Sequence, residues 1–134
     1  MKKRLLFIII GILFIGTSGC SKHDSYFEIE NADSVTIYYG VSSYAFYSTD
    51  EEIINSISDN LNSLSFKKTD HNMNVSSMFT ISLSRDKESL AFVCVDGKGV
   101  FFIDNTANCY EVNSGSFDYA YIQDIYEKGR RSKS

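Results

Sequence analysis

The sequence of 134 residues contains no proline and no tryptophan, and it has only two histidines and three cysteines. Without proline, the chain has no proline-rich spacer of the kind that reaches across a cell wall. The histidines are His23 and His71, and no CxxC, HxxxH or HExxH spacing occurs, which removes the usual patterns of a zinc site. The sequence therefore predicts no metal site and no other cofactor.

Patterns that hold phosphate or calcium are also missing. Residues 96–99, "DGKG", lack both the long glycine loop and the helix of a phosphate-binding loop, and their single carboxylate is too few for an EF-hand. No nucleophile elbow surrounds a serine, and Cys94 and Cys109 lie in apolar or strand-like stretches where thiols are rarely reactive. We predict no catalytic residue. The alternative is a small envelope hydrolase whose residues, His71 among them, meet only in the fold.

The longest apolar run near the N-terminus, residues 5–15, is too short to span a bilayer, which takes about 20 residues. It lies between a positively charged start and a series of small residues that ends at a cysteine: Lys2, Lys3, Arg4, then Gly16, Thr17, Ser18, Gly19 and Cys20. This layout is typical of a secretory signal peptide, which we place at residues 1–19.

Residues 17–20, "TSGC", resemble the lipobox of bacterial lipoproteins. Ser18 and Gly19 fit the motif, whereas Thr17 stands where an aliphatic residue is usual. The resemblance implies cleavage before Cys20, which would become a diacylated first residue on the extracytoplasmic face of the cell membrane, followed by a tether up to residue 33. Two acyl chains hold a domain stably, because each buried CH₂ contributes about 0.8 kcal/mol. A plain secretory peptide and an uncleaved anchor are the alternatives.

Cleavage before Cys20 would leave ten basic and seventeen acidic residues, a net charge of −7. Nucleic acid is therefore not an expected partner, since phosphate binding needs a basic surface. The exception is a basic tail at residues 130–134, which is either a solvated terminus or a weak contact for anionic lipid or wall polymer. A small acidic domain is also compatible with an inhibitor or immunity-type protein against an exported enzyme or toxin.

The remaining cysteines, Cys94 and Cys109, have two interpretations. A disulfide would close a loop of about 15 residues and contribute roughly 3 kcal/mol. The two cysteines lie on strands that are not neighbours in a simple meander, so free thiols that pack as small hydrophobic groups are the other interpretation.

Alternation of apolar and polar residues predicts six strands, and a helical period predicts two helices. The strands are expected at residues 34–42, 44–47, 78–84, 89–95, 100–104 and 109–113, and the helices at 48–66 and 114–129. Ser48 or Thr49 is expected to cap the first helix, with residues 67–77 as a loop. Ser116 is expected to cap the second helix, and Gly129 to end it.

These elements predict one α+β domain at residues 34–129, in the order β-β-α-β-β-β-β-α. An antiparallel sheet of five to six strands would be covered on one face by two amphipathic helices. The overall layout resembles small surface lipoproteins of Gram-positive bacteria.

Tyrosines are more frequent than the predicted core requires, with nine in the chain. Tyr38, Tyr44 and Tyr47 are candidates for an interaction surface, because tyrosine offers a rigid apolar ring with a polar tip. The alternative is that they line the edges of the sheet and helices. The sequence thus favours a membrane-anchored, non-catalytic module that binds a protein or envelope component.

Overall fold

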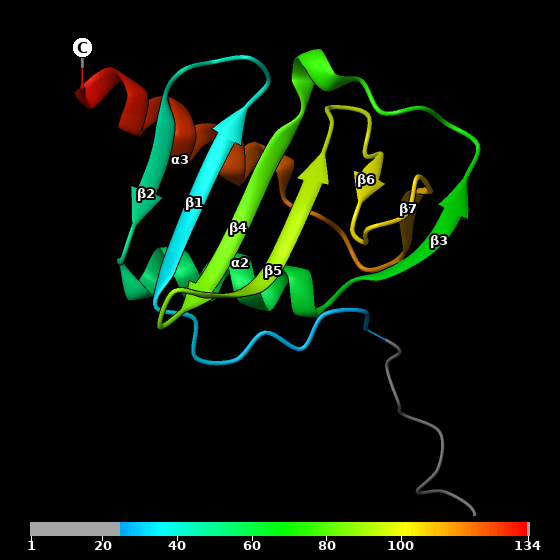
Figure 1. Cartoon of the computed structure of the whole chain (residues 1–134), viewed down its shortest axis with the longest axis horizontal. Coiled ribbons are helices and arrows are strands. Elements are labelled where there is room, and N and C mark those ends of the chain that lie inside the picture. Colours follow the sequence, from blue (N-terminus) through cyan, green and yellow to red (C-terminus); the bar gives the residue numbers. More distant parts are fainter. Residues whose placement is uncertain (1–24, 134) are drawn as a thin grey trace, which may run out of the picture.

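A computed structural model describes residues 25–133 of the chain (Figure 1). In this part of the chain, seven strands form one antiparallel sheet in the order β2-β1-β4-β5-β6-β7-β3. The strands are β1 (Ser34–Tyr39), β2 (Ala45–Ser48), β3 (Ser65–Thr69), β4 (Phe79–Arg85), β5 (Glu88–Val95), β6 (Phe101–Phe102) and β7 (Cys109–Ser114). The helices are α2 (Glu51–Asn62), α3 (Tyr119–Ser132) and a short 3₁₀ turn, η1 (Val75–Ser77). The predicted α+β class is confirmed, with seven strands instead of five to six.

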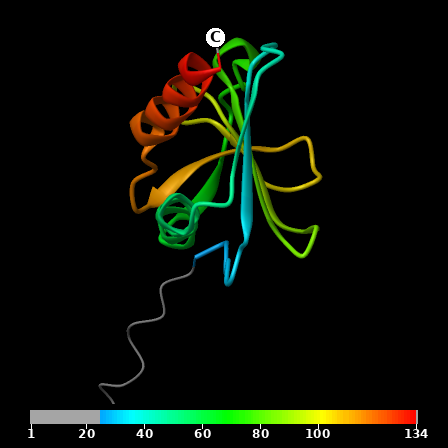
Figure 2. The same cartoon turned by 90° about the vertical axis from the view of Figure 1, so that its left-hand side faces the viewer.

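Helices of the part that the structure describes cover one side of the sheet and leave the other uncovered (Figure 2). Figure 2 shows α2 and α3 on the same side, whereas the β4–β5 turn and the β6–β7 loop rise on the other. Chain connections explain the order of the strands, because the segment from β2 through α2 to β3 runs from one edge of the sheet to the other. The side without helices is called the outer side below.

Alternating side chains of the central strands build the core between the sheet and the helices. In β4, Phe79, Ile81 and Leu83 are buried, and Thr80 and Ser82 point to the outer side. The registers place Ile81 opposite both a β1 and a β5 residue that are also fully buried. Apolar residues therefore meet on the helix side, as the period of two requires.

The first helix begins later than the sequence suggested. Asp50 is its N-cap, and its carboxylate accepts hydrogen bonds from the backbone N–H groups of Glu52 (2.9 Å) and Ile53 (3.4 Å). Ser48, one of the predicted caps, instead accepts a hydrogen bond from the N–H of Asp50 at 3.0 Å. Aspartate is as good a cap as serine, so local sequence does not choose between adjacent candidates.

The strand that sequence reasoning missed is β3, which was expected as the end of a helix and the start of a loop. Among the described strands, β3 lies at the sheet edge and pairs only with β7, with Lys67 opposite Glu111 and Phe66 opposite Val112. Two adjacent lysines hide its period, and its one apolar residue, Phe66, packs against the core. Lysines are common on edge strands, where they discourage pairing with other chains.

The C-terminal helix also differs from the prediction. Its N-cap is Asp118, whose side chain accepts a hydrogen bond from the N–H of Tyr121, and the helix continues past Gly129 to Ser132. Arg130 therefore lies within the helix and pairs with Glu127 at 2.7 Å, so most of the predicted basic tail is helical.

The packed chain begins well before residue 34, where we placed the start of the domain. Phe27 and Ile29 are buried, and Ile29 bonds through its backbone to the side-chain amide of Asn62 on α2, at 2.7 and 2.9 Å. Residues 26–29 therefore belong to the domain and not to a tether.

Candidate interaction surface

The outer side of the sheet carries exposed aromatic side chains in register. Pairing between β2, β1, β4 and β5 places Tyr47, Thr36, Ser82 and Phe92 in one row across the four strands. Directly paired residues project from the same face of a sheet. Tyr47 is 64% exposed and Phe92 is 58% exposed, so two aromatic rings border two small hydroxyl side chains.

A second row lies beside the first. It contains Ala45, Tyr38, Thr80, Cys94 and Phe102, on β2, β1, β4, β5 and β6. Tyr38 is 48% exposed. No helix of the described chain covers these rows (Figure 2). We call the following residues the outer face: Thr36, Tyr38, Tyr47, Ser82 and Phe92.

Tyr44 was predicted as part of this surface, but it faces the helices instead. Its ring packs edge-on against Tyr126 of α3, with ring centroids 5.2 Å apart. Loss of hydration, with a smaller contribution from Tyr126, raises the pKa of Tyr44 above its ordinary value. Tyr44 therefore belongs to the packing between β2 and α3.

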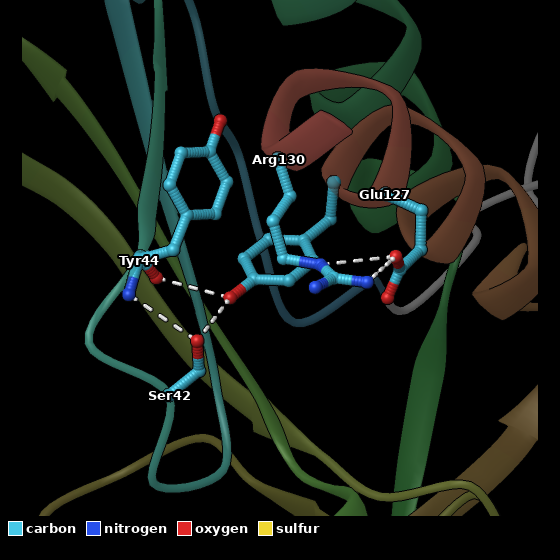
Figure 3. A network of polar contacts seen from close by, with 5 residues as sticks. Ser42, Tyr44, Glu127 and Arg130 are labelled. Carbon is cyan, nitrogen blue, oxygen red and sulfur yellow. Dashed lines mark hydrogen bonds and ion pairs between the residues drawn. The ribbon is translucent and has the colours of Figure 1, made fainter. Parts of the chain in front are cut away.

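Hydrogen bonds hold the first hairpin and α3 together (Figure 3). The hydroxyl of Tyr126 lies 3.0 Å from the carbonyl oxygen of Tyr44 and 3.1 Å from Oγ of Ser42. Ser42 Oγ in turn accepts a hydrogen bond from the N–H of Tyr44 at 3.2 Å. These contacts explain why a tyrosine is buried at this position of the helix, since its hydroxyl has partners there.

Phe92 is the residue of the outer face that sequence reasoning missed. The stretch 89–95 was predicted as a strand. Its period of two places Phe92 on the other face of the sheet from the buried Ala91 and Val93. That period is the signal that identifies Phe92 as an outward-facing aromatic residue.

The structure has Cys94 and Cys109 as free thiols, which corrects the disulfide interpretation. β6 lies between their strands, and Phe102 is the β6 residue opposite Cys94. Strands two positions apart are separated by about 9–10 Å, whereas a disulfide needs Cα atoms within about 7 Å. Cys94 is buried and Cys109 is half-buried.

The loop after β6 is held by the carboxylate of Asp104. Its Oδ1 accepts hydrogen bonds from the N–H and the hydroxyl of Thr106, and its Oδ2 accepts one from the hydroxyl of Tyr110 at 2.6 Å. Hydrogen bonds lower the pKa of Asp104, with the larger contribution from Thr106 and a smaller one from Tyr110. The same Asp104 contact raises the pKa of Tyr110. Asp104 thus remains a carboxylate at neutral pH and shapes the β6–β7 loop.

Asp96, in the "DGKG" turn, is a structural carboxylate. It is fully buried, and its Oδ1 accepts hydrogen bonds from the N–H groups of Lys98 and Val100, both at 2.9 Å. Its Oδ2 accepts a bond from the N–H of Asn74 at 2.9 Å. Asp96 therefore fastens the loop before η1 to the β5–β6 turn.

His71, the base of the hydrolase alternative, is exposed in the loop after β3. It lines a pocket of about 330 Å³ together with Lys98 and Glu111. The backbone N–H of His71 donates a hydrogen bond to Oγ1 of Thr69, and no hydrogen bond joins the His71 ring to a serine or aspartate among residues 25–133. A triad would need such a bond, so the geometry gives no support to catalysis by His71.

Cys20, the predicted lipidation site, lies outside the described residues. Within residues 25–133, no cluster of three potential metal ligands forms, and no helix has the length and apolar character for crossing a bilayer. No protein family, curated protein or solved structure matches the chain.

Proposed function

We propose that the chain is an exported lipoprotein whose folded domain binds a protein partner at the extracytoplasmic face of the cell membrane and performs no chemistry of its own. The anchor would be the diacylated Cys20. The layout of residues 1–20 supports this part, because a charged start, an apolar run and small residues precede a single cysteine. The short distance from Cys20 to the packed Phe27 would keep the domain close to the membrane.

The row of Tyr47, Thr36, Ser82 and Phe92 carries the proposal of a binding module. Four strands at a spacing of about 4.8 Å make this row about 14 Å wide. Aromatic residues dominate the binding energy at the centre of protein interfaces, where they are surrounded by polar groups. The outer face combines large exposed rings with small hydroxyl side chains, which suits a protein surface.

Site-specific cross-linking in cells tests this face. A photo-activated amino acid in place of Ser82, at the centre of the face, should cross-link a discrete protein. The same amino acid in place of Gln123, which is exposed on α3, should not. The double variant Tyr47→Ser with Tyr38→Ser should abolish the Ser82 cross-link. Equal cross-links from both positions, or a cross-link that survives the double variant, would contradict the proposal, as would a cross-link to glycan alone.

Fatty-acid labelling tests the anchor. Cells fed a fatty-acid analogue should label the wild-type protein and the matched control Cys94→Ala, but not Cys20→Ala. Equal labelling of the wild type and Cys20→Ala would refute lipidation at this cysteine and leave the binding face to be judged by cross-linking.

A further inference from the structure

A groove of about 550 Å³ opens beside the first half of β5. The chain at residues 26–28, the start of β5 and the segment 102–105 form its walls. Apolar side chains and two carboxylates line it, among them Tyr26, Glu28, Leu90, Phe92, Phe102 and Asp104. We call this feature the edge groove.

The edge groove exists because β6 is much shorter than β5 (Figure 1). β6 contains only Phe101 and Phe102, which pair with Val95 and Cys94. The chain then turns away from β5, and the hydroxyl of Tyr26 donates a hydrogen bond at 3.3 Å to the carbonyl oxygen of Ile103. In the described chain, the first half of β5 therefore has a strand partner only on its β4 side.

The backbone of Phe92 points into this gap. On the β6 side of the sheet, the N–H of Asp96 bonds to the carbonyl oxygen of Val100 at 3.0 Å. Alternate residues of a strand direct their backbone groups to the same neighbour, so the N–H and C=O of Phe92 follow the direction of Asp96. No strand residue of the described chain lies opposite Phe92 on that side.

We propose that the edge groove binds an extended, positively charged segment of a partner protein, which adds to the sheet as a short strand beside Phe92. This inference rests on the proposed binding function and specifies its mode of contact. An unpaired strand edge selects an extended peptide, because backbone hydrogen bonds supply the contact. The carboxylates of Glu28 and Asp104 select basic side chains, since no lysine, arginine or histidine among residues 25–133 lines the groove.

Three synthetic peptides of eight residues test the proposal with the full chain in detergent micelles. One peptide alternates valine and lysine, the second alternates valine and glutamate, and the third is the valine–lysine peptide with every backbone amide methylated. By fluorescence anisotropy, we expect the first to bind at least tenfold more tightly than either of the others. Equal binding of the methylated peptide, or no saturable binding of the first, would overturn the proposal.

Two variants of Phe92 separate backbone pairing from side-chain contact. Phe92→Pro and Phe92→Val both remove the ring, but only proline removes the N–H that faces the groove. Because this N–H does not bond to β4, proline leaves that ladder without a lost hydrogen bond. We expect the proline variant to bind the valine–lysine peptide at least tenfold more weakly than the valine variant. Equal binding would exclude strand addition at Phe92.

A charge reversal outside the strands tests whether the groove prefers a basic peptide. Glu28→Lys should reduce the preference for the lysine peptide over the glutamate peptide at least fivefold. Glu51→Lys is the matched control, because Glu51 is equally charged and exposed on α2 but does not line the groove. An equal effect of the two variants would show attraction to the overall charge and would refute specific recognition.

These outcomes are distinguishable from failure of the proposed function. Peptide binding that depends on Phe92, without a cross-link at Ser82, would support the edge groove as a binding site and refute the outer face as one. A cross-link at Ser82 without peptide binding would retain the binding module and refute strand addition.

Discussion

Gly129 lies inside α3, where a glycine normally weakens a helix. A Cβ at this position would lie 2.6 Å from Oη of Tyr44 and 2.7 Å from Cδ2 of Phe46. Gly129→Ala should therefore destabilise the protein by roughly 1–3 kcal/mol through overpacking, although alanine is intrinsically about 1 kcal/mol better in a helix. Urea unfolding measures the change, with Gln123→Ala on the exposed side of α3 as control. An unchanged or increased stability of Gly129→Ala would contradict this packing.

Asp104 links stability to pH. Its pKa is lowered in the fold by the Thr106 and Tyr110 hydrogen bonds, so its contribution to stability is present above its ordinary pKa of 3.8 and is lost as the pH falls through the lower folded value. Asp104→Asn should be less stable than the wild type at pH 7, and the difference should shrink below pH 3.8. Urea midpoints of both proteins at several pH values check this. A difference in stability that is independent of pH would contradict it.

The alternation of residues in the sequence could have predicted which face of the sheet each aromatic side chain of the candidate surface projects from. Tyr44 and Tyr47 are three positions apart, and an odd spacing places two residues of a strand on opposite faces. Tyr38 was correctly placed opposite its buried neighbours, and the same period identifies Phe92. The shape of the edge groove could not be predicted, because it depends on where β6 ends and on a contact between Tyr26 and Ile103.

Among the elements, α2 was predictable because its apolar stripe repeats with the helical period. Ile57 is 2% exposed and belongs to this stripe, whereas Ser56 is exposed. Ile57→Ala should lower the free energy of unfolding by about 2–5 kcal/mol, and Ser56→Ala should change it by less than about 0.5 kcal/mol. Urea unfolding of both variants checks the stripe, and equal effects would show that α2 packs differently.

β3 was not predictable for the opposite reason. Its partner β7 lies far along the chain, and its own residues show no alternation, because Lys67 and Lys68 are adjacent. A strand of this kind is specified by pairing across the sheet and not by local preference. The helix ends were similarly uncertain, since Asp50 and Asp118 compete with nearby serines for the cap.

At the scale of the whole molecule, the absence of proline simplifies folding. Slow refolding phases of tens of seconds usually arise from prolyl isomerisation. The chain has no proline, and the two cysteines of the described part are free. Sheets with distant pairings fold in milliseconds to seconds. Refolding of the full chain, followed by stopped-flow tyrosine fluorescence, should therefore show no phase slower than about 10 s. A dominant slower phase would contradict this.

The helix α3 contacts the first hairpin through Tyr126, and β3 pairs with β7, which is the last strand of the described residues. The strand that pairs with β3 and the helix that packs on the first hairpin are both supplied by residues 109–132, so neither contact forms before that part of the chain is made. For the exported chain that we propose, this order would leave the domain open when the chain reaches a translocation pore, which threads unfolded polypeptide.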